Sequence, residues 1–286
     1  MFRKVGALFF LILSMMLIGK GWHFAKDGFS IQRTRFPLGR SHLPEPDFEV
    51  RNALNQSYHY LGRGHQCYAF ESADGQYVLK LPRYDRYTIP FWLRASRFPF
   101  LENVREALQE DKEKRLQFTL NSFHIAFDEL KKETALLYLH LDRTESFRLS
   151  TEVVDRIGRS YRLNLDRTAF ILQRKKPLMM PAFKLALASG NRVEAKEILE
   201  AFLEVIAVRA RKGIFNKDPS FLRNFGYDGE GVQIDIGSFY RKKDVDLMTA
   251  FGPSFLQTIG HVQDWLTTVD PEIASWFKQR TEAMRP

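Results

Sequence analysis

The alternation of apolar and polar residues is clearest between residues 58 and 81. Three short runs, at residues 58–61, 67–71 and 77–81, are rich in aromatic and aliphatic residues and are separated by turn-forming residues. Asp74-Gly75 lies between the second and third runs, and this dipeptide favours the tight turns of β-hairpins. The pattern therefore predicts the start of an antiparallel sheet.

A helical pattern follows from about residue 101 to residue 141. Its stripe recurs every three or four residues and comprises Phe127, Leu130, Thr134, Leu137 and Leu141. This spacing is typical of an amphipathic helix, so we expect at least one long helix to pack on the sheet. An aromatic and basic stretch at residues 89–98 precedes it. We expect this stretch to pack inside the protein, because aromatic side chains usually fill cores, with contact to a membrane as the alternative.

The second half of the chain is predicted to be mainly helical. The other predicted elements are strands at 153–165, 168–173 and 232–236, a helix from Asn191 to Arg211 that Gly213 can end, and further helices to Trp276. Strands that come first and helices that follow predict an α+β protein with a small antiparallel sheet lobe and a helical lobe.

The amino terminus carries a continuous apolar stretch at residues 5–18, preceded by Arg3 and Lys4. The stretch is short for a bilayer span and has the length of a signal-peptide core, but no small-x-small cleavage site follows it. Two alternatives stay open, an uncleaved membrane anchor and a cleaved signal peptide that would export the protein. Cations are more numerous after the stretch than before it, which predicts a single-pass membrane protein with a cytoplasmic carboxyl-terminal domain.

The composition of the chain limits the classes of molecule that it is expected to bind. With 286 residues, 44% of them apolar, the chain can fill a sizeable core. A net charge of +9 favours anionic partners such as nucleotide phosphates or acidic lipid, and the sequence contains no nucleic-acid motif, so no nucleic-acid partner is predicted. Cys67 is the single cysteine, which excludes an intrachain disulfide framework and a cysteine-rich zinc site.

These patterns divide the chain into four parts. We predict a signal anchor or signal peptide at 1–24, a juxtamembrane linker at 25–50, a sheet lobe with a long helical insertion at 51–175, and a helical lobe with the catalytic and metal-binding loops at 176–286.

Residues suited to binding phosphate occur in the predicted hairpins. Gly62 and Gly64 join the first two strands, where glycines let backbone amides approach phosphate oxygens closely. Lys80 lies on the third strand, where its ammonium group can reach phosphates.

Residues suited to proton transfer and metal binding follow far downstream. They are Asp218, Asn224 and Asp235. Carboxylates accept protons and bind hard cations through oxygen. Asp235 also lies between two isoleucines on a predicted strand, where an acid is costly unless it has a partner.

The order of these residues resembles that of the protein-kinase-like superfamily. Leu61-Gly62-Arg-Gly64 and Tyr77-Val-Leu-Lys80 are similar to its glycine loop and third-strand lysine. The segment from Asp218 to Asn224, followed by Ile234-Asp235-Ile-Gly237, resembles its catalytic loop and metal-binding Asp-x-Gly. The resemblance implies a two-lobed fold that binds ATP and Mg²⁺.

The resemblance also implies roles for these residues. Gly62, Gly64 and Lys80 would bind the nucleotide, and Lys80 would be held by a glutamate on a helix, for which Glu133 is the candidate and Glu129 the alternate. Asp218 would orient or deprotonate the acceptor hydroxyl. The metal ligands would be Asn224 and Asp235.

The chain also departs from the family pattern. Four residues separate the family's catalytic aspartate and asparagine, whereas residues 219–223 separate them here. Asn216-Lys217 replaces the usual His-Arg, and Ile236 replaces the Phe of Asp-Phe-Gly. The pattern is therefore that of a divergent, atypical bacterial-type kinase or of a pseudokinase.

The short carboxyl-terminal region bears on the acceptor. After Gly237 only 286 − 237 = 49 residues remain, and no Ala-Pro-Glu motif is present. A small-molecule, lipid or sugar acceptor is therefore favoured over a protein. The sequence predicts a membrane-tethered phosphotransferase that moves the γ-phosphate of ATP to a hydroxyl group. The alternative is an inactive pseudokinase that serves as a nucleotide-binding or scaffolding module.

Overall fold

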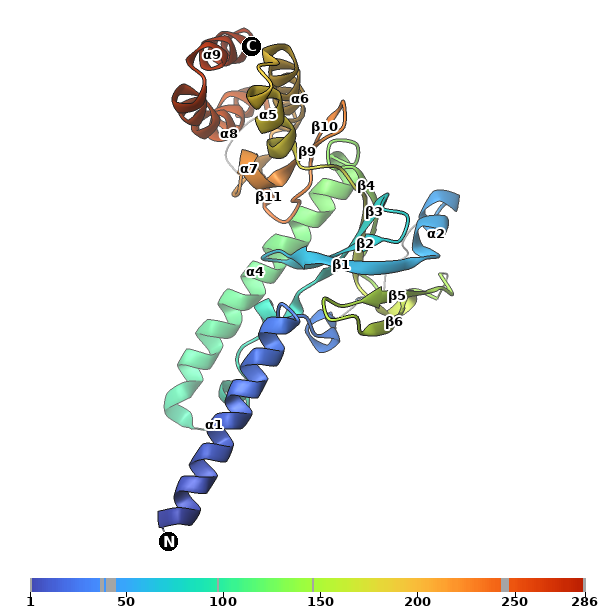
Figure 1. The fold of residues 1–286 in the computed structure, drawn as a ribbon, viewed down its shortest axis with the longest axis vertical. Coiled ribbons are helices and arrows are strands. Elements are labelled where there is room, and N and C mark those ends of the chain that lie inside the picture. The colour runs from blue at the N-terminus through green and yellow to red at the C-terminus, as the bar shows by residue number, and fades with distance from the viewer. Residues whose placement is uncertain are drawn as a thin grey trace. The chain divides into compact units, whose positions relative to one another are not determined.

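The computed structural model describes residues 2–36, 39, 45–96, 98–145, 147–242 and 247–284. The chain folds as two compact units. Unit 1 comprises Met1–Thr88 with His140–Leu172, and unit 2 comprises Ile89–Leu139 with Gln173–Pro286. The fold mixes a sheet with helices, so the predicted α+β class is confirmed, and two units are consistent with a two-lobed fold (Figure 1).

Seven strands form the main sheet, in the order β4-β7-β3-β2-β1-β5-β6. Their bounds are β1 (Ser57–Arg63), β2 (Cys67–Ser72), β3 (Tyr77–Pro82), β4 (Leu136–His140), β5 (Ser150–Val154), β6 (Ser160–Asn164) and β7 (Phe170–Arg174). The antiparallel hairpins of β1, β2 and β3 are confirmed, and Gly75 takes a positive φ of 72° in the turn between β2 and β3. β1 pairs in parallel with β5, so the sheet is mixed rather than wholly antiparallel.

Five short helices lie in the loops between the larger elements of the described chain. They are η1 (Ile31–Thr34), η2 (Tyr84–Tyr87), α3 (Phe91–Ala95), η3 (Pro99–Leu101) and η4 (Leu165–Arg167).

The prediction of one strand over 153–165 was wrong, because a turn interrupts it. β5 ends at Val154, and Asp155 then accepts hydrogen bonds from the backbone amides of Ile157 (3.1 Å) and Arg159 (2.9 Å). Gly158 takes the positive φ of 82° that the turn requires. An aspartate followed by a glycine at this spacing is a turn signal that outweighs the apolar residues on either side.

The predicted helix over 101–141 was too long. α4 (Glu102–Glu129) ends at Glu129, and β4 begins at Leu136 after a turn in which Ala135 has a φ of 52°. Leu137 therefore belongs to a strand. A short apolar run fits the periodicity of a buried strand as well as that of a helix, and here the strand prevails.

The predicted linker at 25–50 is structured where the structure describes it. The Phe29 side chain is 2% exposed, and its ring centroid lies 5.1 Å from that of Tyr68 and 5.2 Å from that of Phe70. Farther on, α2 (Phe48–Leu54) is capped by Asp47, whose carboxylate accepts from the Val50 amide at 2.8 Å. Residues 37, 38 and 40–44 of the predicted linker lie outside the described residues.

The predicted anchor coincides with α1 (Phe2–Ala25), the first helix of unit 1. Within the described part of the chain, however, no helix combines the length and the apolar character that crossing a bilayer requires. The expected membrane helix is therefore not found.

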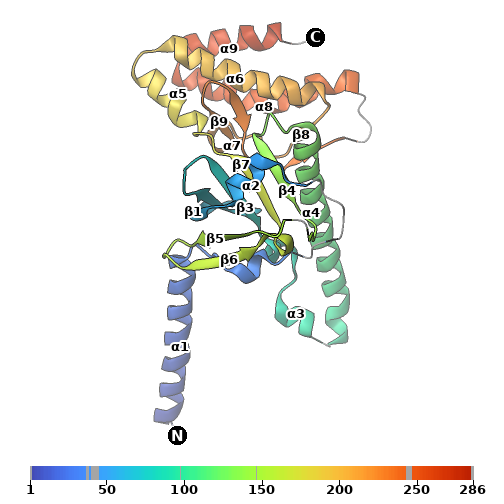
Figure 2. The same cartoon turned by 90° about the vertical axis from the view of Figure 1, so that its right-hand side faces the viewer.

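Unit 2 is built on four long or medium helices that share one core (Figures 1 and 2). They are α5 (Met179–Ala188), α6 (Arg192–Arg211), α8 (Leu247–Val269) and α9 (Pro271–Ala283). The predicted helix from Asn191 to Arg211 is confirmed as α6. Asn191 caps it by accepting from the Glu194 amide at 3.2 Å, and Gly213 follows its end with a φ of 67°.

Phe29→Ala tests whether the segment after α1 belongs to the folded unit. Removing this buried ring should lower the free energy of unfolding by about 3–5 kcal/mol, through lost burial and the cavity left behind. Phe48→Ala is the matched control, because Phe48 is 87% exposed and its truncation should change stability by no more than about 0.5 kcal/mol. Equal effects of the two variants in urea denaturation would contradict the assignment.

Asp155→Asn tests the ion pair that ties this segment to the β5–β6 hairpin. Lys26 Nζ lies 3.1 Å from Asp155 Oδ2, and both side chains are buried. Burial alone would raise the pKa of Asp155, but hydrogen bonds from the Arg159 amide and from Lys26 and Tyr161 lower it on balance. The ionised carboxylate therefore contributes stability above its unfolded pKa of about 3.9, and this contribution is lost as the pH falls through the lower, folded value.

The variant should be less stable than the wild type by about 1–3 kcal/mol at pH 7. Because the wild-type carboxylate becomes protonated in acid, the two proteins should converge below about pH 3.9. Urea denaturation across this pH range measures the gap, and a constant gap would show that the charge of Asp155 is not responsible.

Candidate functional site

The loop that carries Asp218 is held in place by two buried asparagines. It lies between β8 (Phe215–Asn216) and α7 (Phe221–Asn224). Asn216 accepts from the Asp218 amide and donates to the Asp218 carbonyl, both at 3.0 Å. The Asn224 side chain donates to the same carbonyl at 2.9 Å. The backbone of Asp218 is therefore fixed, while its side chain is only half-buried.

Asn224 also fixes the chain that leads to Asp235. After α7 the chain forms the hairpin of β9 (Phe225–Tyr227) and β10 (Gly231–Gln233), and the Ile234 amide then donates to the Asn224 carbonyl at 2.8 Å. Asn224 thus binds the backbone of Asp218 through its side chain and the residue before Asp235 through its own backbone. Asn224 therefore joins the loop that carries Asp218 to the segment that leads to Asp235.

Asp235 itself is not on a strand, contrary to prediction. β10 ends at Gln233, and β11 (Phe239–Tyr240) begins only four residues after Asp235. The Asp235 side chain is half-buried, and its Oδ1 accepts from the Gly237 amide at 3.2 Å in a local turn. The carboxylate therefore needs no buried partner, because it lies in a loop that reaches solvent.

Ser122, on α4, fixes the loop after Asp235. Its hydroxyl donates to the Ile236 carbonyl at 2.6 Å and accepts from the Phe239 amide, also at 2.6 Å. The Ser122 side chain is fully buried. Nothing in the sequence marks this serine, because its partners lie more than a hundred residues away in the chain.

A buried arginine supports β10 from α6. The Arg209 side chain is 1% exposed and donates to Gln233 Oε1 and Thr258 Oγ1, both at 2.6 Å. Burial lowers the pKa of Arg209 to about 10, because the charged form loses its hydration. The contact orients Gln233, two residues before Asp235. Sequence reasoning missed Arg209, since arginines are rarely buried.

Glu133 is not on a helix, so this part of the prediction was wrong. It lies in the turn between α4 and β4, and its backbone carbonyl accepts from the Gln233 amide at 2.7 Å. The alternate, Glu129, is the last residue of α4, and its carboxylate pairs with Arg241 while its carbonyl accepts from Lys212. Glu129 therefore has a structural role. The backbone of Glu133 is hydrogen-bonded to Gln233, two residues before Asp235.

The glycines of the first hairpin are not required by the backbone. Neither Gly62 nor Gly64 has a positive φ, and a Cβ at Gly62 would meet no atom within 4 Å. A Cβ at Gly64 would lie 3.5 Å from the Cys67 carbonyl, an ordinary contact. Arg83 holds the tip of the hairpin by donating to the Gly64 carbonyl at 3.2 Å. Neither a left-handed backbone nor a close contact thus requires these glycines, although the register of β1 shifts between Tyr60 and Gly62.

Lys80 lies on β3, as predicted. It is half-buried, its neighbours Leu79 and Leu81 are fully buried, and it stands opposite Ala69 of β2. Lys80, Gly62 and Gly64 belong to unit 1, whereas Asp218, Asn224, Asp235 and Glu133 belong to unit 2.

The oxygen donors of unit 2 suit magnesium. Among the described residues no group of three or more His, Cys, Asp or Glu side chains could hold a metal ion by itself. Magnesium is commonly bound by one or two protein carboxylates together with substrate phosphates, so a small donor set fits this ion. Asn224 uses its amide nitrogen for the Asp218 carbonyl, so its amide oxygen and the Asp235 carboxylate are oxygen donors of the kind that Mg²⁺ prefers.

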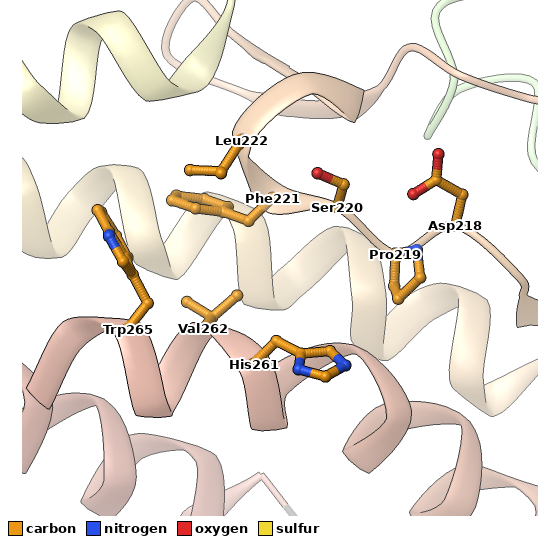
Figure 3. Close-up of a pocket in the computed structure, with 8 residues that line it drawn as sticks. All are labelled: Asp218, Pro219, Ser220, Phe221, Leu222, His261, Val262 and Trp265. Atoms are coloured by element: carbon orange, nitrogen blue, oxygen red, sulfur yellow. The ribbon is translucent and has the colours of Figure 1, made fainter. Parts of the chain in front are cut away.

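A cavity of about 380 Å³ adjoins the Asp218 loop. One wall is formed by the Asp218 loop and the first two residues of α7, Phe221 and Leu222, and the other is the face of α8 that presents His261, Val262 and Trp265 (Figure 3). Asp218 and His261 lie at one end of this set, and Leu222 and Trp265 lie at the other. The cavity therefore has a polar end near the predicted catalytic residue and an apolar end away from it.

Comparisons with known proteins do not identify a family for this chain. No family model matches the sequence, and no curated protein matches it. Three solved structures of WbdD are similar to the chain.

A crystal structure of WbdD is 15% identical with a TM-score of 0.35, and the match covers 78% of this chain and 44% of that one. A co-crystal structure of WbdD with a kinase inhibitor is 14% identical with a TM-score of 0.35, and the match covers 73% and 36%. A structure of the bifunctional kinase-methyltransferase WbdD is 16% identical with a TM-score of 0.31, and the match covers 67% and 34%. This chain spans less than half the length of each. Similarity at such TM-scores does not establish a common fold.

Ser122→Ala tests whether α4 supports the loop after Asp235. The substitution leaves the buried Phe239 amide and Ile236 carbonyl without their partner, which should lower the free energy of unfolding by about 1–3 kcal/mol. Asn121→Ala, an exposed change on the same helix, should alter it by no more than about 0.5 kcal/mol. If urea denaturation gives the two variants the same stability, the hydrogen bonds of Ser122 do not contribute to the stability of the protein.

Proposed function

We propose that the protein is a kinase-like phosphotransferase that uses ATP and Mg²⁺ to phosphorylate a hydroxyl group of a small acceptor. The observation that carries the proposal is the double contact of Asn224. Its side chain binds the backbone of Asp218 and its carbonyl binds Ile234, so the loops of Asp218 and Asp235 are held by one residue. Phosphoryl transfer depends on such fixed positioning of a base and of metal ligands more than on covalent chemistry.

The proposed roles follow the chemistry of each group. Asp218 orients the acceptor hydroxyl and accepts its proton, for which a half-exposed carboxylate on a fixed backbone is suited. Asn224 and Asp235 hold Mg²⁺, which supplies positive charge to the phosphate oxygens when bound. For Gly62, Gly64 and Lys80 the proposed role is to bind the phosphates.

The cavity beside Asp218 supports a small acceptor. Its volume of about 380 Å³ is in the range of small-molecule sites. Polar groups at one end can bind a hydroxyl, while Trp265 and Leu222 offer apolar surface to the body of the molecule. Sugars and lipid-like alcohols are the acceptor classes that this lining fits.

A nucleotide-binding module without transfer activity is the second candidate. It is favoured by the residues that replace the family's His-Arg before Asp218. Asn216 is engaged with the backbone of Asp218, and Lys217 Nζ lies 3.8 Å from the ring centroid of Phe118. Both residues thus make structural contacts, and neither is of the residue type found at its position in the catalytic loop of the family.

Asp218→Asn separates the two candidates. Mg²⁺-ATP should stabilise both the wild type and this variant, by about 2.7 kcal/mol at a hundred times the dissociation constant, because Asp218 is not assigned to nucleotide binding. The variant should lose at least about a hundredfold of the ATP turnover of the wild type, since it lacks the proposed base. Thermal unfolding and release of ADP measure the two effects.

Asp264→Ala is the matched control, because Asp264 is an exposed carboxylate on α8 and its loss should leave both readouts unchanged. Stabilisation by Mg²⁺-ATP without turnover in the wild type would favour the nucleotide-binding module. No stabilisation of the wild type at millimolar Mg²⁺-ATP would contradict both candidates.

A further inference from the structure

Unit 2 exposes a group of large aromatic side chains around α3, which we call the aromatic patch. Its members are Phe91, Trp92, Phe98 and Phe100, which are 73%, 67%, 62% and 75% exposed. The expectation that this stretch packs inside the protein is therefore wrong. Four exposed aromatic rings within ten residues mark an interaction surface, because aromatic groups are usually removed from water.

The aromatic patch is presented by ordered backbone. Leu93 is 2% exposed and anchors α3, and the amides of Leu93 and Arg94 both donate to the Pro90 carbonyl at 3.0 Å. The rings of Phe98 and Phe100 are stacked, with centroids 5.6 Å apart. Since α3 buries its leucine and exposes its aromatic residues, the exposure follows from the local fold.

Two arginines lie among these rings. The guanidinium carbon of Arg94 lies 5.8 Å from the ring centroid of Phe91. Arg105, in the first turn of α4, donates to the Ser96 carbonyl at 3.0 Å and lies 3.4 Å from Glu102 (α3 and α4 are side by side in Figure 2). Both arginines line a hollow of about 540 Å³ together with Glu102 and Phe98. The aromatic patch thus adjoins, through Phe98, a hollow whose two arginines outnumber its one glutamate.

We propose that the aromatic patch is a peripheral docking surface for a bilayer that carries anionic lipid. Tryptophan and phenylalanine favour the boundary between headgroups and acyl chains, and arginine binds phosphate oxygens with paired N–H groups. A purely apolar groove for a protein helix would not need cations inside it. The net charge of +9 adds attraction to an anionic surface. This contact requires no membrane-spanning helix and does not depend on the proposed catalytic activity.

Vesicle binding by the full chain tests the proposal. Wild-type protein should co-sediment with vesicles of phosphatidylcholine and phosphatidylglycerol, more weakly with phosphatidylcholine alone, and less as salt is raised. Phe91→Ala combined with Trp92→Ala should lower the partition coefficient by about tenfold or more, since two interfacial rings are lost. Arg94→Gln and Arg105→Gln should each lower it by about fivefold on the anionic vesicles and have little effect on the neutral ones.

Matched controls remove similar groups elsewhere on the surface. Phe48→Ala deletes a ring that is 87% exposed in unit 1, and Lys114→Gln deletes an exposed cation of α4. Both should bind vesicles as the wild type does. Thermal unfolding should be the same for the wild type and for every variant except Arg105→Gln, because all the other altered side chains are largely exposed, whereas Arg105 also donates to the Ser96 carbonyl.

Several results would overturn the proposal. One is vesicle binding that the patch variants leave unchanged, which would assign it to another surface such as α1. Another is the absence of vesicle binding together with a wild-type dimer that the patch variants abolish in sedimentation, which would assign the patch to a second copy of the chain. Equal binding to neutral and anionic vesicles would exclude the role of the arginines.

Discussion

The buried side chain of Asn224 is the constraint on which the candidate site depends. An amide buried to 6% exposure must satisfy its hydrogen-bonding groups, and Asn224 does so by binding the carbonyl of Asp218. The backbone of the same residue binds Ile234. Two loops that carry the acidic residues therefore have a common reference point, and their geometry is set by buried polar contacts rather than by the flexible side chains themselves.

Around this residue the supporting contacts come from elements far apart in the sequence. Ser122 reaches from α4 to the loop after Asp235, and Arg209 reaches from α6 to Gln233. Each is a buried polar group whose hydrogen-bond partners are neutral, so each restricts its segment through hydrogen bonds rather than through an ion pair. The site of unit 2 is thus a polar framework placed on a helical core of aromatic and aliphatic residues.

Local signals in the sequence predict part of this arrangement. The hairpins of β1 to β3 and the helix α6 with its Asn191 cap follow from residues close together in the chain, and the order of Asp218, Asn224 and Asp235 is visible in the sequence. The end of α4 is not visible in the sequence, because the apolar run after it fits the periodicity of a helix as well as that of a strand. Glu133 was therefore predicted to lie on a helix that in fact ends before it. Ser122 could not be predicted either, since its role exists only when distant segments meet.

The last turn of α1 gives the amino-terminal helix a further significance. Lys26 pairs with Asp155 and hydrogen-bonds to Tyr161 at 2.6 Å, while the guanidinium of Arg159 lies 5.0 Å from the ring centroid of Trp22. Three contacts join the end of this helix to the β5–β6 hairpin, so the helix cannot swivel independently of that hairpin. The direction of α1 relative to this hairpin is therefore set by the packing of unit 1 itself, whereas a flexible connection after Ala25 would leave that direction undefined.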